Sequence, residues 1–327
     1  MDPETIMETT KECSKAVSKF GGIIEKIFGP RWTKKQADAD EYADQKKIDM
    51  IRKNPDMNIS YAEGKLYVSR CDEMLLQRAE QRRQFNEIRQ EKNIEKIIKM
   101  TAEELKDSTE VSDESVDSTW IYRFFETVKD IDSEDIQRIW SKILSKEIAS
   151  PNSTSLRTLE ILRNISTKEA CAFQNIMPYV INLEDDKCFV SSDEDLLASF
   201  HISTNDYFLM DGCGLIQFVP FFNISSTVDS NKQKRNIWTN ERLLSITNRT
   251  YENIRFQIKD IYLLTTAGKE LFNILYSEPN NEFFIKWVEK THKSNSKLRF
   301  EIHQKVKNGA ETEYEDNPIM VYYEKRC

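Results

Sequence analysis

Glycine and proline are scarce in this chain, with 8 of each among 327 residues. Turn-rich all-β folds and glycine-rich phosphate-binding loops depend on these residues, so their scarcity argues against both classes. The chain also has no apolar run of about 18 residues and no secretion signal, so we expect neither a membrane-spanning helix nor export. We therefore expect a cytoplasmic protein.

Histidines and paired cysteines are also few. His201, His292 and His303 are the only histidines, and none lies at helical or strand spacing from another. A zinc site or a histidine-based catalytic triad would need such partners. The six cysteines include no C-x-x-C pair, so we interpret them as reduced thiols. With no P-loop, Rossmann fingerprint or nucleophile elbow either, we predict no catalytic residue, metal site or cofactor, and no enzyme activity.

Charged residues are abundant instead, at 31% of the chain against 39% apolar residues, with a mean hydropathy of −0.62. This balance suits long, partly solvated helices better than one compact globule. The net charge of −8 gives no overall attraction to nucleic acid. We expect an N-terminal helical region (1–60), a long polar helix with an acidic connector (61–117), a central helical bundle (118–180) and a small α+β domain (181–327).

An amphipathic segment, SKAVSKFGGIIEKIF, lies near the N-terminus. Its larger apolar residues fall on one face of a helix. They are Phe20, Ile23, Ile24, Ile27 and Phe28. This face could pack on the body of the protein or on a second subunit, lie on a membrane surface, or belong to a lytic effector segment. We favour packing, because most such faces belong to a core.

The pattern from Leu66 to Leu105 predicts one long helix with a thin apolar seam. The seam includes Met74, Leu75, Phe85, Ile88, Ile94, Ile97 and Ile98. Its basic residues include Arg78, Arg82, Arg83 and Arg89. These arginines are candidates for nucleic-acid contact, but glutamates at i,i+4 spacing offset much of their charge. We favour a solvated helix or the arm of a helical hairpin.

Four amphipathic helices with start signals follow between Trp120 and Phe173. The expected N-caps are Ser118, then Asp132 or Ser133, then Ser153 or Ser155, then a capping box from Ser166 to Glu169. The expected buried residues are Ile121, Phe124, Phe125, Val128, Ile136, Trp140, Ile143, Leu144, Ile148, Leu156, Leu159, Leu162, Ala170, Phe173 and Met177. This segment should form the main core.

Three blocks in this part of the chain, EKNIEKII, WIYRFFETVKDIDSEDIQRIWSKILSKEI and SLRTLE, occur in a recognisable order. Together they resemble a bacterial family catalogued as domain of unknown function 2806, over residues 78–170. This chain has SPNST where relatives tend to carry a Pro-Gly turn. The resemblance brings no catalytic residues with it. Some related helical families are linked to abortive infection, which implies anti-phage defence as a lead.

After Pro178 we expect short helices at 191–200 and 203–213, strands in LIQFVPFFNI and RFQIKDIYLL, a polar loop STVDSNKQKRNIWTN between them, and a capped helix TTAGKELFNILY. This order resembles the closing half of a winged-helix domain. Basic loop residues, Lys232, Lys234, Arg235 and Arg242, are further candidates for nucleic-acid contact. The expected recognition helix, STNDYFLMDGCG, is acidic and apolar, so we favour protein contact. The strands KLRFEIHQKV and IMVYYEKR should form a closing hairpin.

The sequence therefore predicts a mainly α protein with long N-terminal helices and a central bundle, followed by a winged-helix-like α+β domain. We expect a non-enzymatic interaction or scaffold protein that forms homo-oligomers or binds a partner protein. One alternative is nucleic-acid binding through the basic helix at 78–99 or the winged module. The other is a membrane-acting effector that uses its N-terminal helix. No small-molecule substrate is indicated.

Overall fold

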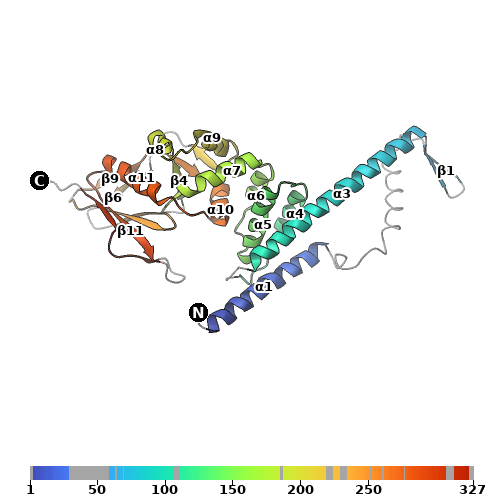
Figure 1. Cartoon of the computed structure of the whole chain (residues 1–327), viewed down its shortest axis with the longest axis horizontal. Helices are drawn as coiled ribbons and strands as arrows, with labels where there is room; N and C mark the ends of the chain where they lie inside the picture. Colours follow the sequence, from blue (N-terminus) through green and yellow to red (C-terminus); the bar gives the residue numbers. More distant parts are fainter. Residues whose placement is uncertain are drawn as a thin grey trace. The chain divides into compact units, whose positions relative to one another are not determined.

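The computed structural model describes residues 3–28, 59–62, 65–68, 70–106, 111–184, 187–218, 224–228, 234–250, 252–259, 261–275, 277–306 and 313–323. The chain forms two compact units, Met1–Asn152 and Ser153–Cys327 (Figure 1). Helices account for about 56% of the described residues, and the larger sheet lies in the second unit. A helical region followed by an antiparallel sheet region is what the sequence predicts. None of the helices in the described segments is both long and apolar enough to cross a membrane.

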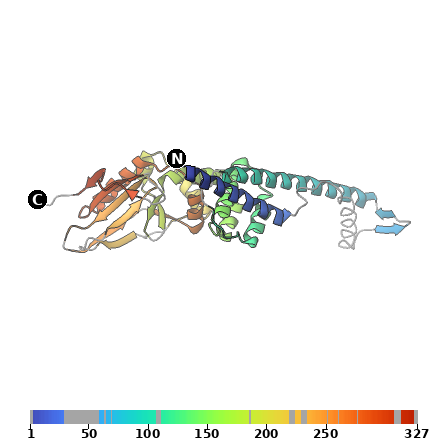
Figure 2. The ribbon, with the colours of Figure 1, turned by 90° about the horizontal axis from the view of Figure 1, so that it is seen from below.

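The first unit is built on the packing of two helices. Helix α3 is long, and its second half packs along α5 and contacts α4. Helix α1 also contacts α3 and α5. Figure 2 shows that α3 extends well beyond the helices it packs against. The elements are α1 (Pro3–Phe28), β1 (Ile59–Ala62), β2 (Lys65–Val68), α3 (Arg70–Leu105), α4 (Ser118–Val128) and α5 (Glu134–Ala149).

The start of the long helix differs from the prediction. Leu66 lies in β2, which pairs with β1 in an antiparallel hairpin, and α3 begins only at Arg70. The physical reason is visible in the sequence, since ISYA and KLYV contain β-branched and aromatic residues and stand on either side of a Glu-Gly pair. Such residues favour strands, and a pair containing glycine favours the turn of a hairpin. The segment RWTKKQADADEYADQKKIDMIRK, residues 31–53, is also expected to form a polar helix, and it lies outside the described residues.

The core of the first unit contains the residues predicted for it. Trp140 is fully buried, and its ring lies edge-on to Phe124 with centroids 5.4 Å apart. The N-cap of α4 is Asp117, whose side chain accepts bonds from two backbone amides, so the helix begins one residue earlier than expected. Ser133 is the N-cap of α5. The predicted residues found buried are Ile121, Phe124, Phe125, Val128, Ile136, Trp140, Ile143, Leu144 and Ile148.

The second unit carries a nine-stranded antiparallel sheet. Its strand order is β12-β11-β8-β7-β3-β4-β10-β5, and β13 also pairs with β11. Helix α11 contributes buried aromatic rings to the core, where Trp287 lies 5.4 Å from Phe189 of β4. The helices are α6 (Leu156–Arg163), α7 (Thr167–Ile176), α8 (Glu194–Ser199), α9 (Thr204–Gly212), α10 (Thr266–Ile274) and α11 (Asn281–Ser294), with a 3-10 turn at Met177–Tyr179.

The strands of the second unit form this sheet and one separate pair, β6 with β9. Their bounds are β3 (Ile181–Leu183), β4 (Lys187–Ser191), β5 (Ile216–Phe218), β6 (Ile224–Val228), β7 (Arg235–Trp238), β8 (Arg242–Thr247), β9 (Ile254–Ile258), β10 (Ile261–Leu264), β11 (Arg299–Val306), β12 (Glu313–Tyr314) and β13 (Met320–Tyr322).

The segment predicted as one central bundle is divided between the units. Helices α4 and α5 belong to the first unit, whereas α6 and α7 belong to the second, where they pack on α10 and α9. The Ser155 amide, at the N-cap of α6, donates to Glu270 of α10 over 2.8 Å. The expected capping box at Ser166 and Glu169 is present. Leu156 was predicted to be buried, which is wrong, because its position in the first turn of α6 leaves it 37% exposed.

Two expectations about strands were also wrong. The polar stretch predicted as a loop contributes to β6 and β7, and the single strand predicted at RFQIKDIYLL forms β9 and β10 in two different sheets. The partner of β6 is β9, and β7 lies between β3 and β8. Such strands are short and polar, so their pairing with distant segments stabilises them more than their own composition does.

Helix α10 approaches the backbone at the start of β5 unusually closely. A Cβ atom on Gly268 would overlap the carbonyl oxygen of Leu215. The N-cap Thr265 accepts from the Gly268 amide, and its own amide donates to the same Leu215 carbonyl over 3.0 Å. Glycine at this position therefore allows the helix to join the sheet.

We predict that Trp140→Ala lowers the free energy of unfolding of the first unit by about 3–5 kcal/mol, because the cavity cannot be filled. The measurement is chemical denaturation followed by circular dichroism. The matched control is Tyr122→Ala on α4, a residue that is 65% exposed. A loss no larger than that of the control would contradict the assignment of Trp140 to the core.

We predict that Gly268→Ala destabilises the second unit by about 1–3 kcal/mol, because the backbone of α10 or β5 must move to admit the methyl group. Gly212→Ala is the control, since no atom lies within 4 Å of its added Cβ. That change should be neutral or slightly stabilising. Equal melting temperatures for the two variants would rule out the close approach.

Candidate functional site

Four large apolar side chains are exposed between residues 74 and 88 of α3, one of them Leu75 at 48%. Phe85 is 69% exposed, Met74 61% and Ile88 58%. Separations of eleven and three residues place them on one face of the helix. We call Met74, Phe85 and Ile88 the outer stripe. Ile97, which is fully buried, lies roughly 140° around the helix from Met74, so the stripe is on a different side from the packed face.

The predicted basic residues of α3 separate into two groups. Arg78 and Arg82 are exposed and flank the outer stripe. Arg83 lies on another side of the helix, where it forms ion pairs with Glu80 at 2.5 Å and Glu87 at 2.6 Å. The bond from Glu80 is the main reason that the pKa of Arg83 is raised. These ion pairs, at spacings of three and four residues, offset the charge of Arg83. The basic charge left for a partner therefore lies beside the stripe.

Arg89 belongs to a polar network that holds α3 in place. Its guanidinium pairs with Asp130 and Asp132, each at 3.0 Å. Asn93, which is buried, donates to Asp132 over 2.8 Å and accepts from Gln137 over 3.3 Å. The bond from Asn93, followed by those from Arg89, lowers the pKa of Asp132. Arg89 therefore links α3 to the connection between α4 and α5, which accounts for its charge.

The predicted apolar face of α1 lies against the first unit. Phe20 is buried, and Ile23, Ile24 and Ile27 are half-buried, whereas the side chain of Phe28 lies outside the described set. Lys19 donates to the carbonyls of Ser112 and Ile148, the second at the C-terminal end of α5, over 3.1 and 2.8 Å. Lys15 pairs with Asp113 at 2.6 Å. These contacts favour packing over a membrane contact for this face.

The basic loop of the second unit does not form a continuous patch. Lys234 is exposed, but Arg235 pairs with Glu184 at 2.8 Å. Arg242 donates to Gln304. Lys232 lies outside the described residues. Two of the four predicted basic residues are therefore engaged in contacts within the sheet.

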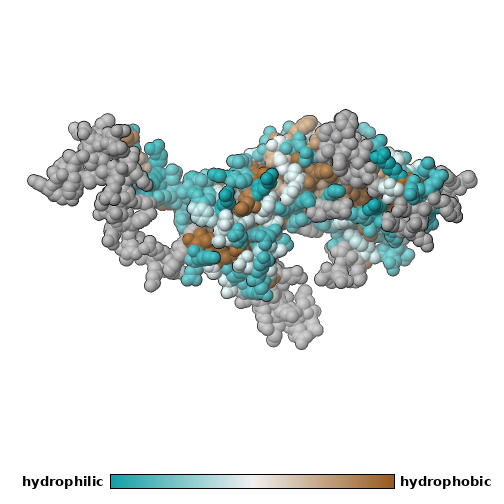
Figure 3. Space-filling model, turned by 180° about the vertical axis from the view of Figure 1, so that it is seen from behind, coloured by the Kyte–Doolittle hydropathy of each residue, from teal (hydrophilic) through white to brown (hydrophobic). Residues whose placement is uncertain are grey.

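Sequence reasoning did not single out the surface formed by α9 and β5. Phe208 is 66% exposed and Phe218 is 47% exposed. Asp211 accepts a bond from the Phe218 amide over 3.1 Å, and Asp206 accepts from Asn175 over 3.2 Å. Asp206 is two residues from Phe208, so it lies on nearly the opposite side of α9. We call Phe208, Asp211 and Phe218 the α9 face. Hydrophobic surface is visible where α9 lies in Figure 3.

The α9 face is acidic. Neither α9 nor β5 contains a lysine or arginine. Burial, followed by the charge of Asp211, raises the pKa of Tyr262, whose ring lies 5.0 Å from that of Phe218. Its acidic and apolar character was visible in the sequence of the expected recognition helix, but its exposure was not.

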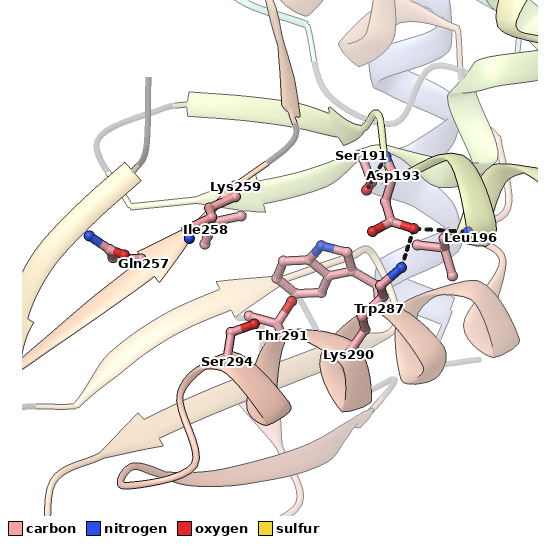
Figure 4. Close-up of a pocket in the computed structure, with 10 residues that line it drawn as sticks. All are labelled: Ser191, Asp193, Leu196, Gln257, Ile258, Lys259, Trp287, Lys290, Thr291 and Ser294. Atoms are coloured by element: carbon pink, nitrogen blue, oxygen red, sulfur yellow. Dashed lines mark hydrogen bonds and ion pairs between the residues drawn. The ribbon is translucent and has the colours of Figure 1, made fainter. Parts of the chain in front are cut away.

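A small cleft lies between α8, α11 and β9, with a volume of about 120 Å³ (Figure 4). Trp287 and Lys290 line it, and Lys290 pairs with Asp193 at 2.5 Å and Asp195 at 3.2 Å. Lys290, which α11 contributes to the cleft, is therefore held by two carboxylates. The cleft contains no paired nucleophile and base that would suggest catalysis.

Metal ligands do not cluster in the described part of the chain, where no group of three His, Cys, Asp or Glu residues could hold an ion. The cysteines with described side chains, Cys171, Cys188 and Cys213, are free thiols. The candidate sites considered further are two exposed surfaces, the outer stripe and the α9 face.

Comparison with known proteins gives one match. Residues 77–287 match the model of a family described as "Protein of unknown function (DUF2806)". The match covers more than half of the chain and reaches from α3 to α11. It thereby includes helices and strands of both units, well beyond the blocks that suggested the resemblance. No curated protein and no solved structure matches the chain.

We predict that Asp132→Asn lowers the melting temperature at neutral pH and that this difference disappears in acid. The pKa of Asp132 in the folded protein is below its ordinary value of 3.8. Its ionised carboxylate therefore stabilises the fold at every pH above 3.8. This stabilisation is lost as the pH falls through the folded pKa. The measurement is thermal unfolding at neutral pH and below about pH 4. Glu103→Gln, an exposed change on α3, is the control, and a pH-independent difference for Asp132→Asn would contradict the prediction.

Proposed function

The chain belongs to the DUF2806 family, and from that premise we propose that it is a non-enzymatic interaction protein that self-associates through the outer stripe of α3. One observation carries this proposal: Met74, Phe85 and Ile88 are each more than half exposed on one face. Large apolar side chains grouped on an exposed helix are typical of a contact surface. A helix that needed only to be solvated would not carry them.

The energetics favour an assembly that depends on concentration. Burying each side chain of the outer stripe contributes about 1.5–3 kcal/mol. Association costs several kcal/mol in lost freedom of motion. The two contributions are similar in size, so the stripe and its charged neighbours are both needed for a stable contact.

The charges beside the stripe indicate what the partner surface should contain. Arg78 and Arg82 are exposed there, and the Nε of Arg78 is bonded only to the backbone carbonyl of Met74. Glu80 and Glu87 lie on another side of α3, bonded to Arg83. The stripe should therefore bind a surface that is apolar and acidic.

We also propose a winged-helix-like arrangement within the second unit. The chain order β4, α8, α9, β5 and β10, with β10 between β4 and β5 in the sheet, supports this proposal. So does the turn between α8 and α9, where His201 has a positive φ of 55°. Strands β6 to β9 are inserted between β5 and β10. Because α9 occupies the recognition position and is acidic, this arrangement favours protein contact over DNA.

The other expected functions are less well supported. Nucleic-acid binding would need Arg83, Arg89 and Arg235, which are held in ion pairs. Membrane binding would need the face of α1 on which Phe20 is buried.

A cytoplasmic location and a role in anti-phage defence remain parts of the proposal. The defence role would be tested by plating phage on cells with and without the gene.

We expect the protein to show a mass that rises above 38.5 kDa with concentration in sedimentation or light scattering. Phe85→Ser with Ile88→Ser should reduce it to the monomer mass without changing the circular dichroism spectrum, because both residues are exposed. Tyr122→Ser removes an aromatic ring that is equally exposed on α4, and it should assemble like the parent. A parent protein that stays monomeric across the micromolar range would refute self-association.

A further inference from the structure

Self-association through the outer stripe requires a second surface to which the stripe binds. A symmetric contact between two stripes would bring Arg78 and Arg82 of both copies to the same interface. The acids of this segment, Glu80 and Glu87, lie on another side of the helix and cannot offset them. Like charges brought together in this way disfavour the symmetric contact.

The α9 face has the complementary composition. Phe208 and Phe218 expose aromatic rings, and Asp211, three residues from Phe208 and on the same side of α9, provides the charge opposite to that of the stripe. Two α9 faces could not pair with each other either, because each is acidic. The described part of the chain thus presents one basic apolar surface on the first unit and one acidic apolar surface on the second.

The hydrogen bonds of β5 favour a helix as the occupant of this face. Strand β5 ends the order of the nine-stranded sheet, and an added strand would need its outward backbone groups. The amide of Phe218 already donates to Asp211 over 3.1 Å. Asp211 therefore protects this edge against strand addition. A partner must bind through side chains, as a helix with an apolar face does.

We propose that the outer stripe of one copy docks on the α9 face of a second copy, so that the chains associate head to tail. This inference rests on the proposed self-association and names its second surface. The contact joins two different surfaces, so the first copy keeps its α9 face and the second keeps its stripe available for further copies. Contacts of this kind produce rings or filaments rather than closed symmetric dimers.

The experiment mixes two variants of the full chain. The stripe variant carries Phe85→Ser and Ile88→Ser, and the face variant carries Phe208→Ser and Phe218→Ser. Each should be monomeric alone, because each lacks one half of the contact. Their equimolar mixture should form a heterodimer, since the intact stripe of one fits the intact face of the other. Native mass spectrometry with one variant isotopically labelled identifies it.

The possible outcomes separate this inference from the proposed function. If the parent protein does not assemble, self-association itself fails. If the parent and the face variant assemble equally well and the stripe variant does not, self-association stands and the head-to-tail contact is overturned. Tyr122→Ser again serves as the control for the loss of an exposed ring.

A charge reversal tests the charge pairing separately from the aromatic contacts. Arg82→Glu should weaken assembly by about tenfold, the effect of losing a close charge pair. Mixing a chain that carries Arg82→Glu and Phe208→Ser with one that carries Asp211→Lys and Phe85→Ser should restore the heterodimer. The same mixture with Asp211 unchanged should bind more weakly. Equal binding in both mixtures would overturn the pairing of these two surfaces.

Discussion

The packing of α3 on α5 is the contact on which the rest of the first unit depends. It buries Ile97 and Leu105, and Thr101 donates to the backbone carbonyl of Ile97 within it. A polar helix of 36 residues would be only marginally stable alone, so the packed half sustains the half that extends from it. Phe85 and Ile88 are exposed because they lie on a different side of α3 from this packed face.

Buried polar groups define how these elements meet. Gln137 donates to Asn93 and to the carbonyl of Ile131, and Asn93 donates to the carbonyl of Lys129. Such a network fixes one arrangement of α3 against the other helices. In the second unit, Gly268 has the corresponding role, since only a residue without a Cβ fits against Leu215. Both units therefore hold a helix by one close and specific contact beside a larger apolar core.

The two candidate surfaces have the same design with opposite charge. Each combines exposed aromatic or aliphatic side chains with charge of one sign. Arg83 is paired with two glutamates away from the stripe, and Asp206 is bonded to Asn175 away from Phe208. The charges that remain beside the apolar residues are the ones able to select a partner.

Local patterns in the sequence were sufficient for the helices, their caps and the family. The apolar stripe from Ile136 to Ile148, the N-cap at Ser155 and the capping box at Ser166 act within a few residues, so the sequence specifies them directly. Only the tertiary structure decided that α6 joins the second unit and that β6 pairs with β9. The same holds for the seam of α3. Phe85 and Ile97 both belong to the seam predicted from the sequence, but they lie about 120° apart around the helix. The first is exposed and the second buried, because the sequence pattern does not specify which side of a helix its neighbours will cover.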